Sequence, residues 1–290
     1  MSIGISLLPT LENKSVQQPL LNRPIRSRGL AGFLRVLVLP IALLGGCAHP
    51  TLQEGTGRTE LAPFSGAHPG GPLPYGWQTW VLSRFKRTTE YKLVRDAQGG
   101  DTVIEASADR AASGLVKLVD VEPTKQLRLQ WKWKVPRLIA TADNARRDAD
   151  DSPVRIFVTF DGDFSKLDFE DRAMAVQVKS LTGRDLPYAT LMYIWENKLP
   201  VDKLIEGHHT SRIMMIVAES GIERRGEWIE FQRNIAEDFV RAYGEKPGRI
   251  RTVGIMTDTD NTGEQVIAYY GDIRLVTQLV ATPPAAETKP

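Results

Sequence analysis

The most distinctive chemically active residues lie in an acidic loop, Thr257–Gly263, with the sequence TDTDNTG. Asp258, Asp260 and Thr262 have the spacing of the first, third and fifth positions of an EF-hand calcium loop. The twelfth position is Tyr269, where an EF-hand needs a bidentate glutamate, and strand patterns flank the loop instead of helices. These residues could therefore form a calcium site of another kind. The alternative is a tight turn in which the Asp and Asn side chains cap the backbone.

A second charged segment, residues 142–151, joins two apolar strand patterns. It ends in Asp150 and Asp151, and Arg155 follows on the next predicted strand. Carboxylates and a guanidinium that lie together can hold a polyhydroxylated or charged ligand. The alternative is a solvated loop without a ligand.

Two tryptophans alternate with polar residues on their predicted strands. Trp195 is expected on the same face as Asn197, and Trp228 on the same face as Glu230 and Gln232. An aromatic ring beside polar groups is typical of a platform for a sugar ring and also of a protein interface. Asp150, Asp151, Arg155, Trp195, Asn197 and Trp228 are therefore the candidate ligand-binding residues.

Catalysis on a polysaccharide would need an acid–base set that converges in a cleft, and Glu230, Arg233 and Asp238 are the candidates for it.

The pair His208-His209 is expected in a surface loop, because adjacent residues of a strand point in opposite directions and cannot easily share a metal ion. The sequence contains no Ser-His-Asp order, Gly-rich phosphate loop, HExxH motif or dinucleotide fingerprint.

Composition excludes several further classes of protein. The chain has 290 residues and one Cys, so it has no intrachain disulfide framework, Cys-based zinc site or iron–sulfur cluster. The net charge of +2 comes from residues 1–46, which carry five basic residues and one acidic residue; the remainder has 32 basic and 34 acidic residues, a net charge of −2. Nucleic-acid binding has no electrostatic support.

Most of the candidate site residues lie on predicted strands or directly next to them. In Leu127–Val135 the apolar residues, including Trp131 and Trp133, alternate with polar ones, so both tryptophans are expected in the core. In Val266–Thr277, taken as one strand, Tyr269 and Tyr270 are expected on opposite faces. The further predicted strands are Tyr91–Arg95, Thr102–Ser107, Gly114–Val119, Val154–Phe160, Thr190–Trp195, Arg212–Ala218, Glu227–Arg233 and Arg251–Thr257.

Two segments are expected to be helical. Leu167, Met174, Val178 and Leu181 lie on one helical stripe, although Met174–Val178 also fits a strand. Ile235–Tyr243 ends before Gly244, a common helix stop. Many strands with short turns and few helices predict a mainly β protein, an antiparallel, jelly-roll-like β-sandwich with one or two short helices.

The first residues have the features of an export signal. Basic residues precede the 12-residue apolar run Phe33–Leu44, which is too short to span a membrane. The run ends in Leu44-Gly45-Gly46-Cys47, which resembles a bacterial lipobox, in which the cysteine is acylated and becomes the N-terminus. Ala48, in place of Asp, implies sorting to the outer membrane by the same resemblance. We expect a lipoprotein that faces the periplasm or the cell surface, with Cys47 as its lipid anchor.

The predicted domain organisation follows from these patterns. Residues 1–46 are the signal peptide, and residues 47–74, rich in Gly, Pro, Thr and His, are a flexible tether. Residues 75–279 form a single β-sandwich domain, and residues 280–290 are a disordered tail.

Several motifs together resemble a known bacterial family. They are Ala142-Asp143, Asp150-Asp151, Arg155–Val158, Tyr193–Asn197, Arg233-Asn234-Ile235 with Asp238, Met256–Gly263 and Tyr270–Ile273. They resemble a family catalogued as a domain of unknown function, number 3047, over about residues 77–276. The resemblance implies an exported envelope protein and implies no activity.

Three functions remain open. The first is a lipid-anchored module that binds a glycan or another small ligand, with a Ca²⁺ ion at the acidic loop as its one candidate cofactor. The second is a polysaccharide hydrolase or lyase on the same fold. The third is an envelope scaffold without a small ligand. A shallow aromatic strip would favour the first, a deep carboxylate-lined groove the second and a flat apolar patch the third.

Overall fold

The structure is a computed structural model that describes residues 61–82, 85–98, 100–182 and 185–278. These residues belong to one compact unit. Cys47, the signal peptide and residues 280–290 lie outside the described residues. No helix in the described ranges is long and apolar enough to span a bilayer.

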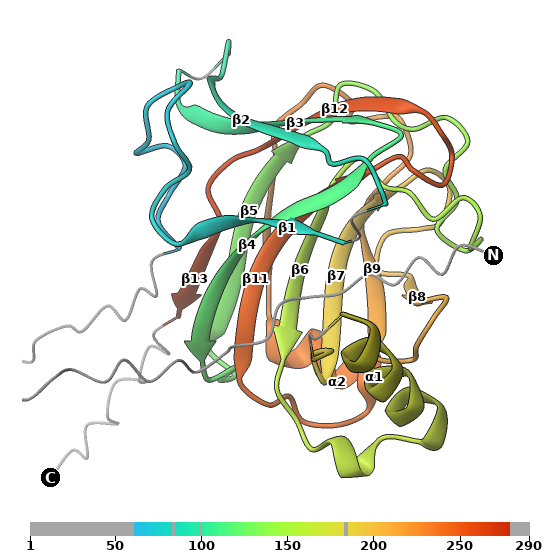
Figure 1. The fold of residues 1–290 in the computed structure, drawn as a ribbon. Helices are drawn as coiled ribbons and strands as arrows, with labels where there is room; N and C mark the ends of the chain where they lie inside the picture. Colours follow the sequence, from blue (N-terminus) through green and yellow to red (C-terminus); the bar gives the residue numbers. More distant parts are fainter. Residues whose placement is uncertain (1–60, 83–84, 99, 183–184, 279–290) are drawn as a thin grey trace, which may run out of the picture. The chain divides into compact units, whose positions relative to one another are not determined.

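Two β-sheets form the domain (Figure 1). The seven-stranded sheet has the order β1 (Trp77–Val81), β4 (Ala112–Val121), β11 (Ile250–Asp258), β6 (Arg155–Phe160), β7 (Ala189–Glu196), β9 (Ile213–Ser220) and β8 (Leu204–Glu206). The six-stranded sheet has the order β10 (Ile229–Arg233), β5 (Leu127–Lys134), β12 (Gln265–Tyr270), β3 (Thr102–Asp109) and β2 (Glu90–Arg95), and β13 (Arg274–Thr277) pairs with β5. The named pairs are antiparallel except β7 with β9. The mainly β sandwich is confirmed.

The main core lies between the inner faces of the two sheets. Trp131 and Trp133 of β5 are buried there, as the alternation of that strand predicts. Tyr193 and Trp195 of β7 enter the same core from the other sheet.

The outer face of the seven-stranded sheet carries a second apolar layer. Phe157, Met192 and Met215 are register partners across β6, β7 and β9, and all three are buried. Strands β6 and β7 are therefore buried on both faces, which explains why their sequences alternate less clearly than that of β5. Arg155 lies at the start of β6 on this outer face.

Helices lie at the ends of strands. α2 (Ile235–Tyr243) has the predicted bounds, with the Asn234 side chain as N-cap and Gly244 at φ 69° as C-cap. α1 (Phe169–Thr182) confirms the helical alternative for its segment, and a short 3₁₀ turn, Phe164–Lys166, precedes it.

Three features differ from the sequence-based expectation. β1 and β8 were not among the predicted strands. The expected strand Val266–Thr277 is two strands, β12 and β13, separated at Gly271-Asp272-Ile273. The described part of the expected tether, residues 61–74, packs on the domain: Leu61 and Phe64 are buried in the main core, and the indole of Trp77 donates to the Leu61 carbonyl at 2.7 Å.

Candidate functional site

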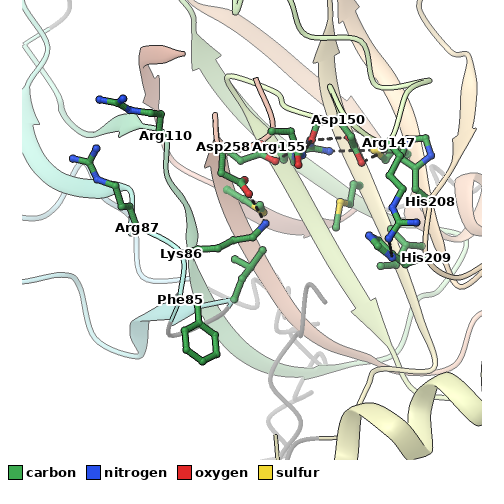
Figure 2. Close-up of a pocket in the computed structure, with 18 residues that line it drawn as sticks. Phe85, Lys86, Arg87, Arg110, Arg147, Asp150, Arg155, His208, His209 and Asp258 are labelled. Carbon is green, nitrogen blue, oxygen red and sulfur yellow. Dashed lines mark hydrogen bonds and ion pairs between the residues drawn. The ribbon is translucent and has the colours of Figure 1, made fainter. Parts of the chain in front are cut away.

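A cleft of about 490 Å³ opens on the outer face of the seven-stranded sheet (Figure 2). Methionines from three strands, Met192 of β7, Met215 of β9 and Met256 of β11, contribute its apolar lining. Its polar lining residues are Lys86, Arg87, Arg110, Arg147, Asp150, Arg155, His208, His209, Asp258, Asp260 and Asn261.

Arg155 and Asp258 form the charged centre of the cleft. β6 and β11 are neighbours, and Arg155 is the register partner of Met256, two residues from Asp258. The Arg155 Nε atom donates to Asp258 Oδ1 at 2.9 Å, and Nη2 donates to Oδ2 at 3.0 Å. Arg155 is 3% exposed and Asp258 is 4% exposed. Such a two-point contact fixes the orientation of the guanidinium.

Asp150 holds the same guanidinium from the preceding loop. Arg155 Nη2 donates to Asp150 Oδ1 and to the Asp150 carbonyl, both at 3.0 Å, and Asn144 Nδ2 donates to Asp150 Oδ1 at 2.9 Å. These carboxylates raise the pKa of Arg155 above its ordinary value although burial opposes them. Burial raises the pKa of Asp258 to about 7, and Arg155 acts in the opposite direction.

Further basic side chains lie around this centre. Lys86 pairs with Asp260, whereas Arg147 has no carboxylate partner among the described residues. The Arg147 guanidinium lies 3.5 Å from His209 Nδ1 (Figure 2). Burial, then Arg147 and then His208, lower the pKa of His209. The ring of His208 lies 3.1 Å from the Asn144 carbonyl.

Asp151 joins the two predicted acidic segments, because it lies in one of them and its carboxylate binds the backbone of the other. Its carboxylate accepts the backbone N–H of Asn261 at 3.3 Å and that of Thr262 at 2.7 Å, and burial raises its pKa. One carboxylate oxygen each of Asp151, Asp258 and Asp260 lie within 4.8 Å of one another, so these three could hold a metal ion. Thr262, proposed as a ligand from the sequence, contributes its hydroxyl to the turn as an acceptor for Glu264 N at 3.4 Å.

The three carboxylates are a poor match for a calcium site, because two of them already pair with basic side chains. Asp258 is already bound to Arg155, and Asp260 is already bound to Lys86. Ca²⁺ prefers six to eight oxygen ligands, and it would compete here with two fixed cations. The backbone bonds of Asp151, and the bond from Gly263 N to the Thr259 carbonyl at 3.0 Å, are those of a capped turn.

The other predicted ligand-binding residues lie outside the cleft. Trp195 is 1% exposed in the main core, where its Nε1 donates to the Gly221 carbonyl at 2.9 Å, so its ring is not available to stack on a sugar. The Asn197 amide donates to the Ile139 and Ala142 carbonyls and holds a loop.

Trp228 lies beside the six-stranded sheet. Its Nε1 donates to Asp96 Oδ2 at 2.9 Å, and Lys134 Nζ lies 4.9 Å from its ring centroid. It therefore shares no site with Arg155.

The three candidate catalytic residues do not converge. Arg233 and Asp238 form a two-point ion pair at 2.7 and 2.8 Å, and the Tyr193 hydroxyl donates to the same carboxylate at 2.9 Å. Glu230 is exposed, whereas the neighbouring Phe231 packs toward the core, so Glu230 lies on the opposite face of β10 from Arg233. This corrects the expectation of a common acid–base set.

Sequence reasoning missed the histidines of the cleft and four of its basic residues, Lys86, Arg87, Arg110 and Arg147. His208 and His209 follow β8 and precede β9, so both approach the cleft from one loop although their side chains diverge. The available signal was their position in a short polar segment between two apolar strands. Arg147 carried the same signal, because it lies in the charged segment 142–151 between two apolar strand patterns, whereas Lys86 carried none.

Comparison with known proteins identifies the family. Residues 75–274 match the family described as "Protein of unknown function (DUF3047)". The chain belongs to this family. No curated protein matches it.

Solved structures similar to this member of the family include carbohydrate-binding modules. The family 11 module of the cellulase Lic26A-Cel5E from Clostridium thermocellum is 10% identical, with 78% of this chain and 98% of that chain covered and a TM-score of 0.34. The xyloglucanase domain of NopAA from Sinorhizobium fredii is 8% identical, with coverage of 73% and 97% and a TM-score of 0.40. Likeness at these scores carries no information about the ligand of this chain.

Proposed function

We propose that the protein is a glycan-binding β-sandwich module and that its cleft binds an acidic sugar. The observation that carries the proposal is Arg147, a cation on the cleft wall without a carboxylate partner among the described residues, in a cleft that it shares with two histidines.

The charge balance of the cleft favours an anion. The carboxylates of Asp150 and Asp258 are bound to Arg155, and that of Asp260 is bound to Lys86. Arg147 is left to pair with a ligand. An arginine suits a carboxylate because its planar guanidinium can donate two parallel hydrogen bonds.

The remaining lining suits a saccharide. A volume of about 490 Å³ lies in the range of small-molecule sites. The partly exposed Ile213 offers an apolar surface to the C–H face of a sugar ring, and the amide of Asn261 and the histidines offer hydrogen bonds to hydroxyls. Phe85, 83% exposed at the cleft, supplies an aromatic face.

The cleft is better suited to binding a glycan than to cleaving it as a hydrolase or a lyase would. Both oxygens of Asp258 accept hydrogen bonds from Arg155, so this carboxylate is held as an ion-pair partner. General acid–base catalysis needs a carboxyl group within reach of the substrate proton. The scaffold alternative gains no support from a charged, concave surface.

The location of the module is part of the proposal. The basic and apolar leader and the Leu44–Cys47 motif support export and lipid attachment at Cys47, with the domain at the outer membrane on the periplasmic or outer surface.

Isothermal titration calorimetry tests the proposal with methyl β-D-glucuronide, methyl β-D-glucoside and oligogalacturonides. The uronides should bind and the neutral glucoside should bind at least tenfold more weakly. Arg147→Ala should weaken uronide binding at least tenfold, whereas Arg225→Ala, a change in an exposed residue outside the cleft, should not. Equal affinity for neutral and acidic sugars, or unchanged binding by Arg147→Ala, would contradict the proposal.

A further inference from the structure

A second cavity, also of about 490 Å³, lies beside α1 at the outer face of the seven-stranded sheet. The residues that line it include Thr159 of β6 and Arg172, Ala175 and Val176 of α1. None of the described residues lines both this cavity and the charged cleft. A ligand in the cavity would therefore occupy a separate site, and the volume lies in the range of small-molecule sites.

Accessible apolar side chains form much of the cavity wall. Phe164 is 37% exposed and Val176 is 70% exposed, and Ala175 and Leu186 are partly exposed. The ring of Phe164 packs edge-to-face on that of Tyr188, with 5.8 Å between the ring centroids. An aromatic ring of a ligand can pack on the accessible part of Phe164 and against the aliphatic side chains beside it.

A buried hydroxyl lies on the sheet side of this cavity. Thr159 is 1% exposed, and its Oγ1 has no hydrogen-bond partner in the described part of the chain. A hydroxyl can donate one hydrogen bond and accept others, and a buried hydroxyl left unpaired is destabilising. A polar group of a ligand that enters between α1 and the sheet would supply the missing partner.

Five charged residues also line the cavity: Asp161, Arg172, Lys179, Asp185 and Arg251. Three of them have partners of opposite charge. Lys179 pairs with Asp185 at 2.7 Å, and Arg251 pairs with Asp120 at 2.7 Å. These three charges are therefore compensated by the protein itself.

Arg172 is the cation that is left for a ligand. It is exposed on α1 and has no carboxylate partner among the residues that the structure describes. The other remaining charge, Asp161, accepts the backbone N–H of Gly162 at 2.9 Å. A guanidinium can donate two parallel hydrogen bonds to a carboxylate, so Arg172 favours a ligand with a carboxylate group.

We propose that this cavity binds a small aromatic carboxylic acid that carries a hydroxyl at the end opposite its carboxylate. The carboxylate pairs with Arg172 at the exposed edge, the ring packs on Phe164 and Val176, and the hydroxyl bonds to Thr159. The inference goes beyond the proposed function, because it assigns a second class of ligand to a separate site and does not require a glycan in the cleft.

Three probes with one carbon skeleton separate these contributions: 4-hydroxycinnamate, cinnamate and 4-hydroxycinnamyl alcohol. Isothermal titration calorimetry with the full chain should show the tightest binding for 4-hydroxycinnamate. Cinnamate lacks the hydroxyl and the alcohol lacks the negative charge, so each should bind about tenfold more weakly.

Arg172→Gln tests the carboxylate contact. The variant should bind 4-hydroxycinnamate and cinnamate about tenfold more weakly and the uncharged alcohol with unchanged affinity. Arg225→Gln makes the same change at an exposed arginine outside the cavity and should change none of the three affinities.

Thr159→Val tests the hydroxyl contact, because valine keeps the shape of the side chain. The variant should bind 4-hydroxycinnamate no more tightly than cinnamate, and its affinity for cinnamate should be unchanged. The matched control is Thr252→Val on β11. Thr252 is the register partner of Thr159 and has an equally buried, unpartnered hydroxyl, but it does not line the cavity. If Thr159→Val does not fold, Arg172→Gln and the three probes keep the test decisive.

The outcomes distinguish this inference from the acidic-sugar proposal. Absence of 4-hydroxycinnamate binding, or equal affinities for the three probes, would overturn the inference alone. Binding that Arg172→Gln leaves unchanged and Arg147→Ala abolishes would place the acid in the charged cleft and would also overturn it. Binding of 4-hydroxycinnamate as expected, without binding of methyl β-D-glucuronide, would overturn only the acidic-sugar proposal.

Discussion

Arg155 and Asp258, 103 residues apart in the sequence, face each other across neighbouring strands and share two hydrogen bonds of 2.9 and 3.0 Å. Asp258 Oδ1 also accepts the backbone N–H of Ser152 at 3.0 Å. This pair therefore joins the loop before β6 to the end of β11. It also holds the charged centre of the cleft together, and it leaves Arg147 without a carboxylate partner among the described residues.

Breaking this pair should destabilise the fold. Arg155→Met should lower the free energy of unfolding by about 3–5 kcal/mol at pH 8, because a buried carboxylate would lose its cation. The double variant Arg155→Met/Asp258→Leu should be less destabilised than Arg155→Met, since the fully buried carboxylate is gone and only the partly exposed Asp150 is left without its cation. Urea unfolding followed by tryptophan fluorescence measures both, with Arg225→Met as the surface control. A loss below 1 kcal/mol for Arg155→Met would show that the pair contributes little.

The raised pKa of Asp258 predicts a pH dependence of stability. In the unfolded chain an aspartate releases its proton near pH 4, whereas burial raises the pKa of folded Asp258 to about 7. Between these values the folded state binds more protons, so this residue's contribution to stability falls as the pH rises from 4 to 7. Asp258→Asn lacks this titration.

Urea unfolding of both proteins from pH 4.5 to 8 measures this effect. The free energy of unfolding of the wild type minus that of Asp258→Asn should decrease toward pH 7 and level off above it. Asp148→Asn, at an exposed carboxylate, is the matched control. A difference that increases with pH would mean that Arg155 outweighs burial and holds the pKa of Asp258 below its ordinary value.

Local sequence patterns predicted the sandwich because strands such as Leu127–Lys134 are polar on one face. They predicted Asp150, Arg155, Asp258 and Asp260 as ligand or metal residues, yet in two separate groups. The pairing of β6 with β11 unites these groups, and no local period shows which distant strands pair.

Two errors have definite physical causes. Asn197 follows the end of β7, so its polarity says nothing about the face on which Trp195 lies; that strand is buried on both faces. In the segment predicted as Val266–Thr277, the break at Gly271–Ile273 shifts the alternation by one residue. Tyr270 is consequently buried, although the unbroken pattern grouped it with polar residues.

Lipid attachment is tested by Cys47→Ser in the full-length chain. The variant should lose membrane association, because the acyl chains that hold a lipoprotein to a bilayer would be absent. Fractionation of cells into membrane and soluble parts, with metabolic labelling by a palmitate analogue, measures both attachment and acylation. Ala48→Ser is a neighbouring change that should remain labelled and membrane-bound. Cys47→Ser protein that stays with the membranes would contradict anchoring through this residue.

Calcium binding should depend on the cations that now neutralise the acidic cluster. In the wild type, Lys86 and Arg155 occupy two of the three carboxylates, so 1 mM Ca²⁺, a concentration of about the order that weak extracellular sites need, should change the melting temperature little. Lys86→Met removes one competitor and leaves Asp260 without its ion-pair partner. The variant should therefore gain a Ca²⁺-dependent increase in melting temperature that EDTA reverses, because a ligand that binds the folded state stabilises it.

The control is Lys198→Met, which removes a long ion pair of 3.9 Å outside the cleft and should gain no calcium-dependent increase in melting temperature. A large calcium effect in the wild type, lost in Asp258→Ala and Asp260→Ala, would instead make the loop a calcium site in which the ion outcompetes Lys86.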